Sequence, residues 1–429
     1  MMINFNEQLE IEDEFDIDLD SDGKVNEYEN DDDDFESYFS SEQLEKLRDK
    51  FKEFTRQANK FGKPTIIKTY WEMSQEHDRY LDTKSQKKFA STASQAEQNL
   101  ENKALDFFQI ELNNINLAIN YAEESQQWQV VLDMSENLRR FLNTRTYWQE
   151  LEEIQKKALE AAKKAKNRST QASILNQLGE IDRLRGRATE GISKCEESRS
   201  IFQSLQDKYG EAKALYTLGY LNRSLGEYKK SAKTFEEALE LFRSLVDVEE
   251  DVADSLDGLG QAYEKQGDLD QAEKVLLECL QIKEKLNNRF KISISLNNLG
   301  KVYTQQNRLE DAKAIFEKCL KIKEEIIDRQ GQATSLNKLG KVHRLKGEYE
   351  TALNYYNKSI KIKEIVSKEK GGRPDKHGQG LTYMEMGLLY EEIGEEEKTR
   401  NYFQLALNHL NDYSAEFKEI AKKIQETDG

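Results

Sequence analysis

An all-α fold is predicted from three features of the sequence. Only two prolines occur in 429 residues, which favours helices because a helix interior excludes proline. Apolar residues make up 37% of the chain and charged residues 34%, a balance that suits amphipathic helices with one wet face. A Leu-Gly or Met-Gly pair also recurs about every 40 residues between Leu178 and Gly387, which predicts an array of repeated helix pairs.

Residues 1–41 differ from the rest of the chain in charge. They hold 16 acidic residues and a single base, Lys24, and so carry −15 of the total −17, which leaves −2 for the remainder. A nearly neutral body argues against non-specific nucleic-acid binding, and the acidic segment would repel phosphates. We expect residues 1–41 to be a solvated, disordered tail.

Part of this tail, residues 18–29, resembles the calcium-binding loop of EF-hand proteins. It fits the pattern D-x-D-x-D-G-x5-E, with Gly23 at the sharp turn and Val25 at the inward apolar position. The resemblance implies that calcium, the one candidate cofactor, is bound by oxygen atoms. These belong to Asp18, Asp20, Asp22, the Lys24 carbonyl and Glu29. The alternative is a chance match within an acidic tract, because Asn30 stands where an apolar residue normally begins the exiting helix.

The helical part of the chain begins after this tail. Residues 42–108 are helical in composition with a break at Pro64, and they match no repeat. Over residues 109–170 the repeat is degenerate, and Trp128 to Lys166 is predicted to form two amphipathic helices separated near Thr144.

Six regular units follow over residues 171–413, and residues 414–429 are predicted to form a C-terminal capping helix. Seven residues after the first glycine of each unit stands a glycine or asparagine, at which a tight turn with positive φ costs little. Twelve and sixteen residues after it stand a small and a large residue, such as Ser231 and Phe235, on one face of the second helix. Each unit is therefore predicted to nest two antiparallel helices.

These units resemble the tetratricopeptide repeat. The Leu-Gly pair of its Trp-x2-Leu-Gly-x2-Tyr signature recurs, and the tyrosine is kept at Tyr263, Tyr303 and Tyr390. The 40-residue period is longer than the usual one of about 34 and is similar to that of kinesin light chain repeats. The resemblance implies a right-handed superhelix whose concave surface is lined by the first helix of each pair.

The degenerate helices before the repeats resemble the region that precedes the repeat array in bacterial signalling ATPases. The ATPase itself is not expected, because no Gly-x4-Gly-Lys-Ser/Thr motif occurs. The last repeat spacing is 47 residues, and the Gly- and Pro-containing residues 370–380 are predicted to form a flexible loop that accounts for the excess.

No residue pattern points to catalysis. The four histidines share no motif, and His343, at the tyrosine position of its repeat, is predicted to be a packed imidazole. Cys195, Cys279 and Cys319 fall at core positions and are expected to be buried and unreactive. Three cysteines without disulfide or zinc spacing, no secretory signal and no long apolar run predict a cytoplasmic protein that does not enter a membrane.

A partner-binding groove is predicted on the first helices. The resemblance places three positions of each first helix inward: three residues before the glycine, and one and four residues after it. Asn can hydrogen-bond a peptide backbone, and Lys or Arg favours acidic groups. The candidate binding residues are Asn176, Arg183, Tyr216, Tyr220, Arg223, Asn297, Lys301, Asn337, Lys341 and Arg344. The alternative is a solvated polar face without a partner.

The sequence thus predicts a non-enzymatic scaffold or adaptor that binds a peptide or protein segment in its groove. The acidic tail or calcium is expected to regulate it, because the tail could occupy the basic part of the groove. A different class is also open, a sensor of a peptide or small ligand in a bacterial signalling system, which would need an apolar pocket beside Tyr216 and Tyr220.

Overall fold

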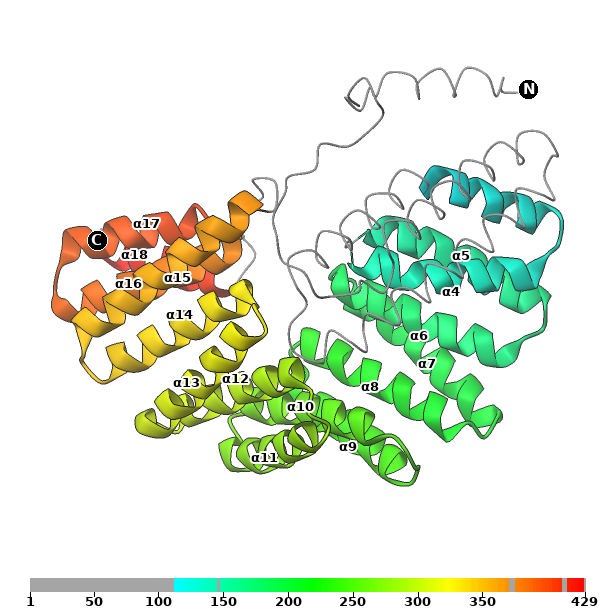
Figure 1. Cartoon of the computed structure of the whole chain (residues 1–429), viewed down its shortest axis with the longest axis horizontal. Helices are drawn as coiled ribbons and strands as arrows, with labels where there is room; N and C mark the ends of the chain where they lie inside the picture. The colour runs from blue at the N-terminus through cyan, green and yellow to red at the C-terminus, as the bar shows by residue number, and fades with distance from the viewer. Residues whose placement is uncertain (1–111, 145–146, 370–374, 411–414, 428–429) are drawn as a thin grey trace, which may run out of the picture. The chain divides into compact units, whose positions relative to one another are not determined.

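The computed structural model describes residues 112–144, 147–369, 375–410 and 415–427, and every regular element within these ranges is an α-helix. A helix over residues 112–124 comes first. The helices that follow it in Figure 1 are α4 (Trp128–Thr144), α5 (Trp148–Lys164), α6 (Arg168–Leu184), α7 (Ala188–Ser204), α8 (Lys208–Ser224), α9 (Tyr228–Arg243), α10 (Glu249–Gln266), α11 (Leu269–Lys285), α12 (Arg289–Gln305), α13 (Leu309–Glu325), α14 (Arg329–Leu345), α15 (Tyr349–Glu369), α16 (Lys376–Ile393), α17 (Glu396–Leu407) and α18 (Ala415–Thr427).

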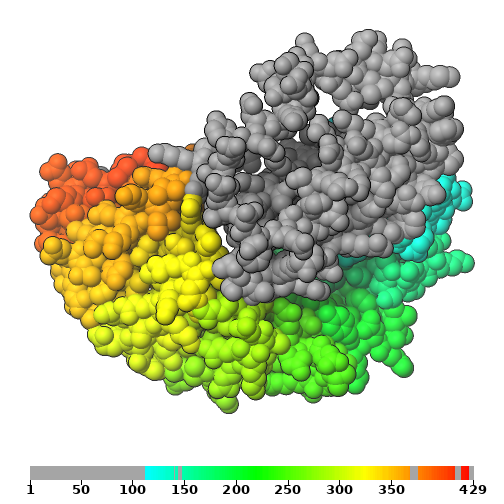
Figure 2. Space-filling model, viewed as in Figure 1, coloured from blue at the N-terminus to red at the C-terminus, as the bar shows by residue number. Residues whose placement is uncertain are grey.

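Successive helices pack as antiparallel pairs. α6 packs on α7, α8 on α9, α10 on α11, α12 on α13, α14 on α15 and α16 on α17. The second helix of each pair also contacts the first helix of the next pair, and the green, yellow and orange surfaces of these helices adjoin in Figure 2. The predicted all-α solenoid of helix pairs is therefore confirmed.

The small-on-large packing predicted within each pair is present between α8 and α9. Phe235 is fully buried, and a methyl group placed on Gly219 would lie 2.8 Å from its ring carbons. The two helices can approach this closely only because residue 219 has no side chain. The hydroxyl of Ser231 adds a hydrogen bond to the Gly219 carbonyl at 2.8 Å.

One residue with a left-handed backbone conformation stands in each of the turns described next, both between the two helices of a pair and between successive pairs. Within a pair it is the predicted second glycine, such as Gly226 with φ 78°. Between pairs it is another residue type, such as Asn287 with φ 50° or Ile327 with φ 56°. The next helix is then capped by a carboxylate or amide, as where the Asp328 side chain accepts the Gly331 N–H at 2.9 Å.

The first helices form the inner side of the array. α6 contacts α8, α8 contacts α10, α10 contacts α12 and α14 contacts α16, in addition to the contacts of each with its own partner. Over the described residues the second helices show no comparable contacts with one another. First helices that pack more closely than second helices must lie on the concave side, which is where the sequence predicts the groove.

Part of the predicted loop at residues 370–380 is helical, which corrects the sequence-based expectation. α15 continues to Glu369, and α16 already begins at Lys376. The cause is an N-cap at Asp375, whose carboxylate accepts the backbone N–H of Gly378 at 2.9 Å. Glycine content predicted a loop here, but a cap of this kind starts a helix regardless of the glycines in its first turns.

Several expectations concern the ends of the chain. α4 ends at Thr144, where the sequence predicted a break, and α18 lies where a C-terminal capping helix was expected. The acidic tail at residues 1–41, its calcium loop and the segment 42–108 lie outside the described residues. None of the described helices is both long and apolar enough to span a membrane.

Candidate protein-binding groove

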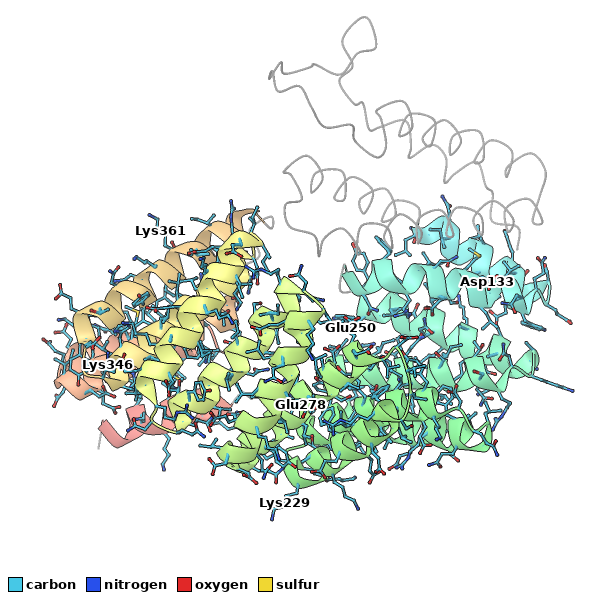
Figure 3. All side chains as sticks on the ribbon, turned by 60° about the horizontal axis from the view of Figure 1, so that its bottom comes forward. Asp133, Lys229, Glu250, Glu278, Lys346 and Lys361 are labelled. Atoms are coloured by element: carbon cyan, nitrogen blue, oxygen red, sulfur yellow. The ribbon has the colours of Figure 1, made fainter. Side chains whose placement is uncertain are left out.

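All ten predicted groove residues lie on first helices. Two stand on α6, three on α8, two on α12 and three on α14. Their spacing of three and four residues keeps the members from each helix on one face. Outward-facing charges such as Lys229 and Lys361 are exposed on second helices and extend away from the ribbon in Figure 3.

The α6–α8 part of the predicted groove is aromatic. The rings of Tyr216 and Tyr220 meet edge-on with centroids 5.0 Å apart, and both contact the buried ring of Phe235, at 6.0 and 5.0 Å. Arg183 and Arg223 lie over the Tyr220 ring, at 5.5 and 4.8 Å from its centroid. Burial raises the pKa of Tyr220 to about 12, so its hydroxyl stays protonated at neutral pH.

Most cations of the groove already have partners within the protein. Arg183 donates to Glu180 at 2.6 and 2.8 Å, and Arg223 donates to Gln261. On α6, the Asn176 amide oxygen accepts the thiol of Cys195 at 3.4 Å. These side chains therefore contribute shape and fixed dipoles to the groove rather than free charge.

The cations on α14 form ion pairs with carboxylates of α16. Arg344 donates to Glu385 at 3.1 Å and also contacts Glu392, and Lys341 contacts Glu385 at 3.1 Å. Arg344 and Glu385 are both about 95% buried, with exposed fractions of 6% and 5%. Two of the cations predicted to line the groove are thus neutralised by α16. This pairing could not be predicted from the sequence, because Glu385 stands 41 residues after Arg344.

Lys301 and Lys338 are the exceptions. Among the residues with described positions, neither lysine has a carboxylate within ion-pair distance, and Lys301 Nζ donates only to the Asn298 amide at 3.2 Å. Burial lowers the pKa of Lys301 to about 8 and also lowers the pKa of Lys338. Lys338 was not predicted, because it lies outside the three inward positions that the resemblance gives for each first helix; it stands 40 residues after Asn298, which occupies the same repeat position.

Two amides beside these lysines are also unsatisfied. The Oδ1 atoms of Asn297 and Asn337 are inaccessible to water and have no hydrogen-bond donor in the described structure. Asn337 is 8% exposed. Buried polar atoms normally have partners, so these two oxygens mark a place where the protein alone leaves hydrogen bonding incomplete.

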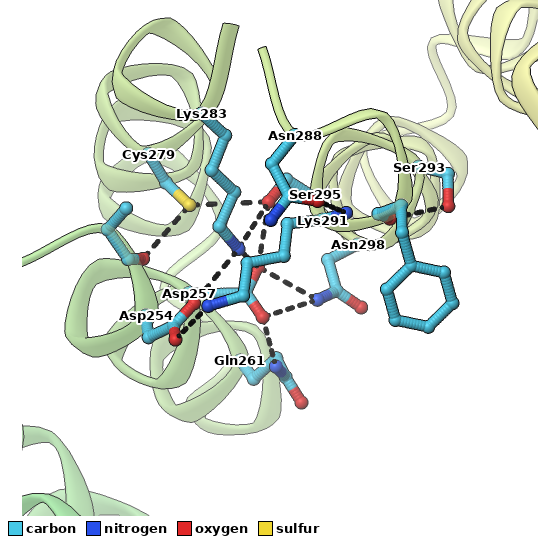
Figure 4. Close-up of polar contacts among 12 residues, drawn as sticks. Asp254, Asp257, Gln261, Cys279, Lys283, Asn288, Lys291, Ser293, Ser295 and Asn298 are labelled. Carbon is cyan, nitrogen blue, oxygen red and sulfur yellow. Dashed lines mark hydrogen bonds and ion pairs between the residues drawn. The ribbon is translucent and has the colours of Figure 1, made fainter. Parts of the chain in front are cut away.

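In the order of first helices, α10 stands between the aromatic α8 and α12 with Lys301, and its acidic face carries the polar network drawn in Figure 4. Asp257 accepts from Gln261 at 3.0 Å and from Asn298 at 3.2 Å, and Lys283 donates to the Ser295 hydroxyl beside it at 3.0 Å. This network joins α10, α11 and α12. Its groups satisfy one another, so the network holds the three helices together and leaves little capacity for a ligand.

The remaining candidate residues for chemistry are packed. Cys195, Cys279 and Cys319 are free thiols with no exposed surface, as predicted. His343 is 4% exposed, stacks on Tyr355 and contacts Glu348 through Nδ1 at 2.5 Å, so it is the packed imidazole that was expected. No group of three or more metal-ligating side chains occurs in the described ranges, and the predicted calcium loop lies outside them.

Comparison with known families identifies the repeats. One model of the tetratricopeptide repeat matches residues 170–244, 251–325 and 291–365, and another matches residues 216–285. Residues 170–365 are tetratricopeptide repeats. No catalytic family is indicated, and no curated protein matches the chain significantly.

Solved structures with the same fold include sensor proteins. The apo form of the quorum sensor NprR from B. thuringiensis has a TM-score of 0.55 at 14% identity, covering 86% of this chain and 99% of that one. A signal transduction ATPase with a tetratricopeptide repeat sensor from Pyrococcus horikoshii has a TM-score of 0.53 at 12% identity, covering 90% and 55%. A Rap protein complexed with competence and sporulation factor has a TM-score of 0.51 at 11% identity, covering 88% and 99%.

Proposed function

We propose that this chain is a non-enzymatic, cytoplasmic scaffold that binds a segment of another protein along the inner face of its first helices. Stacked repeats of this kind present extended concave surfaces that are used for binding. The observation that carries the proposal is the pair of unsatisfied amides, Asn297 and Asn337, on two adjacent first helices. An extended segment offers backbone N–H groups at intervals, and rotation of the two Asn side chains would bring their buried, unsatisfied oxygens to these donors.

A selection of displayed random peptides against the full-length protein tests this proposal. Peptides should be enriched that bind the wild type and lose at least roughly tenfold in affinity for an Asn297→Ala/Asn337→Ala variant, since two hydrogen bonds are removed. The matched control is Lys229→Ala/Lys361→Ala, which changes exposed residues on second helices and should bind as the wild type does. Enrichment that both variants leave unchanged would contradict a binding site on this face.

The proposal includes regulation by the acidic tail. Residues 1–41 carry a charge of −15, and Lys301 and Lys338 have no ion pair with any residue whose position is described, whereas Lys341, Arg344 and Arg223 have partners. The tail is therefore proposed to compete with a partner at these lysines, and calcium bound at residues 18–29 would weaken the competition by cancelling charge. Deleting residues 1–41 should tighten partner binding at low salt, and an unchanged affinity would rule this regulation out.

A sensor of a peptide or small ligand is the second candidate, and the aromatic cluster favours it. Tyr216 and Tyr220 are held edge-on over Phe235 and flanked by two guanidinium groups, a surface on which a ring or an apolar group could pack. Similar folds include a quorum sensor and a Rap protein complexed with a factor. A sensor should contract on ligand binding in solution scattering and lose that response in Tyr216→Ala, whereas a scaffold should keep its dimensions.

A further inference from the structure

A buried thiol and a buried amine lie together where α11 packs on α12. Cys279 and Lys283 stand four residues apart on α11, so their side chains lie on the same face of that helix. Both contact the hydroxyl of Ser295 on α12. Cys279 Sγ lies 3.3 Å from Ser295 Oγ, and Lys283 Nζ donates to the same oxygen at 3.0 Å (Figure 4). One hydroxyl thus holds the sulfur and the nitrogen in one small cluster.

This cluster is closed to solvent. Cys279 and Ser295 have no exposed surface, and Lys283 is 2% exposed. Burial raises the pKa of the Cys279 thiol to about 11, and the neighbouring Lys283 ammonium opposes this rise. Polar oxidants in solution do not reach such a thiol. A covalent change here therefore needs a small, apolar reactant and groups that are already inside the cluster.

Two carboxylates of α10 complete the surroundings of the amine. Asp254 and Asp257 lie 3.6 and 4.0 Å from Lys283 Nζ. An ammonium nitrogen has no free electron pair until it loses a proton, and a carboxylate this close can accept that proton. The Asp254 side chain is 29% exposed, so the proton can pass on to water.

The next repeat has the same thiol and amine in different surroundings. Cys319 and Lys323 have the same spacing on α13, with exposed fractions of 0% and 6%. There the Ser335 hydroxyl donates to Cys319 Sγ at 3.5 Å, whereas Lys323 donates to the Gly331 carbonyl at 3.2 Å. Lys323 forms no ion pair with any residue whose position is described. Its thiol and amine share no hydroxyl, and the amine has no carboxylate to accept a proton.

We propose that Cys279 and Lys283 form a modification site at which dioxygen places one oxygen atom between sulfur and nitrogen, giving an N–O–S bridge. The S–H bond, one N–H bond of the neutral amine and the O–O bond break, and an S–O and an N–O bond form. Sulfur and nitrogen each give up two electrons, and dioxygen accepts all four. Its second oxygen atom takes both hydrogens and leaves as water, so atoms and electrons balance.

The bridge changes the charge of the network that joins α10, α11 and α12. A nitrogen bonded to oxygen is a far weaker base than an amine, so bridged Lys283 carries no positive charge at neutral pH. Asp254 and Asp257 then lose a buried cation that faces both of them. Four electrons from two molecules of a dithiol reverse the change and restore the thiol and the amine. The site therefore makes this helix junction sensitive to oxygen.

The intact mass of the full-length protein tests this site after incubation in air or under argon without added thiols. In air we expect a gain of one oxygen atom with the loss of two hydrogen atoms, and no gain under argon. Dithiothreitol should reverse the gain, which separates it from methylation of similar mass. Tryptic peptides should place it in the segment that begins at Val275, with no cleavage after Lys283. An unchanged mass in air, or oxygen added to Cys279 without loss of hydrogen, would overturn the site.

Matched variants separate this pair from its counterpart one repeat later. Lys283→Arg keeps the positive charge and should abolish the gain in mass, whereas Lys323→Arg should leave it unchanged. Cys279→Ser should also abolish it, and Cys319→Ser should not; serine occupies this repeat position naturally at Ser359. A gain that survives Lys283→Arg, or that maps to Cys319 and Lys323, contradicts the proposal. Peptide mapping of the wild type decides the matter even where a variant fails to fold.

Discussion

Lys363 donates a hydrogen bond from Nζ to the Thr382 hydroxyl at 2.7 Å, across the boundary between two helix pairs. The same repeat position holds Lys283, which donates to Ser295 at 3.0 Å, and Lys323, which donates to the Gly331 carbonyl at 3.2 Å. All three lysines are at least 94% buried. Each lysine therefore links a second helix to the first helix of the next pair. At the same repeat position the preceding repeats have a buried phenylalanine.

The Lys363 contact predicts a pH-dependent stability difference. Burial lowers the pKa of Lys363 to about 8 in the folded chain, from an unfolded value of 10.5. The folded state then disfavours the charged amine, so the resulting destabilisation is full below pH 8 and fades as pH rises to 10.5. From about pH 7.5 to 9.5 the free energy of unfolding of the wild type, measured in urea, should rise by on the order of 1 kcal/mol relative to that of Lys363→Met. Exposed Lys361→Met is the control and should show no such trend.

Ile327 is predicted to be a site of strain. It has φ 56°, where a β-branched side chain crowds its own backbone, and its side chain is 53% exposed. Ile327→Asn should raise the free energy of unfolding by about 1 kcal/mol. The reverse change at the equivalent turn, Asn287→Ile, should lower it by a similar amount. Equal stability of all three proteins in chemical denaturation would contradict this account.

Gly219→Ala should destabilise the protein by about 2 kcal/mol, because the added methyl would overlap the Phe235 ring. In a Phe235→Leu background the same change should cost less, since the ring is gone. Gly226→Ala serves as the control: its methyl meets nothing within 4 Å, so its cost comes from the positive φ and should not depend on Phe235. A double-mutant cycle from thermal unfolding separates the two causes.

Glu385→Gln should cost about 3 kcal/mol of unfolding free energy, because it leaves the buried guanidinium of Arg344 with only the more exposed Glu392 as counter-ion and also removes the ion pair of Lys341. An exposed pair gives the comparison. Glu278 contacts Arg243 at 2.5 Å with both side chains more than 40% exposed, so Glu278→Gln should change stability by less than about 0.5 kcal/mol. A similar loss of stability in both variants would mean that burial does not determine how much these ion pairs contribute to the free energy of unfolding.

Calcium binding by residues 18–29 stays a prediction, and calorimetry of the full-length protein tests it. Titration of millimolar calcium should release or absorb heat that disappears in Glu29→Gln, because that residue is expected to supply a bidentate carboxylate. Glu36→Gln removes the same charge from the tail outside the loop and should retain the heat. If the two variants behave alike, the tail attracts calcium only by its charge.

The helix pairs and their turns could be predicted because their causes are local. A Leu-Gly pair, a second glycine and a small and a large residue all lie within one repeat, as Gly219, Gly226 and Phe235 do. Helix hydrogen bonding, left-handed turns and small-on-large packing each depend on residues that are close in sequence. The start of α16 was predicted wrongly although its cause is also local. One capping carboxylate at Asp375 outweighed the loop preference of the surrounding glycines.

The charge of the groove could not be predicted in this way. The sequence by itself determined that the protein folds into repeated helix pairs, that their first helices carry Asn, Lys and Arg, and that the net charge is concentrated in residues 1–41. Only the tertiary structure decided which cations remain free. Packing of α14 on α16 brings Glu385 to Arg344 and Lys341, whereas Lys301 and Lys338 face carboxylates that already have other donors. The physical reason is that pairing of charges depends on distances across neighbouring repeats, which the stacking of the helices sets.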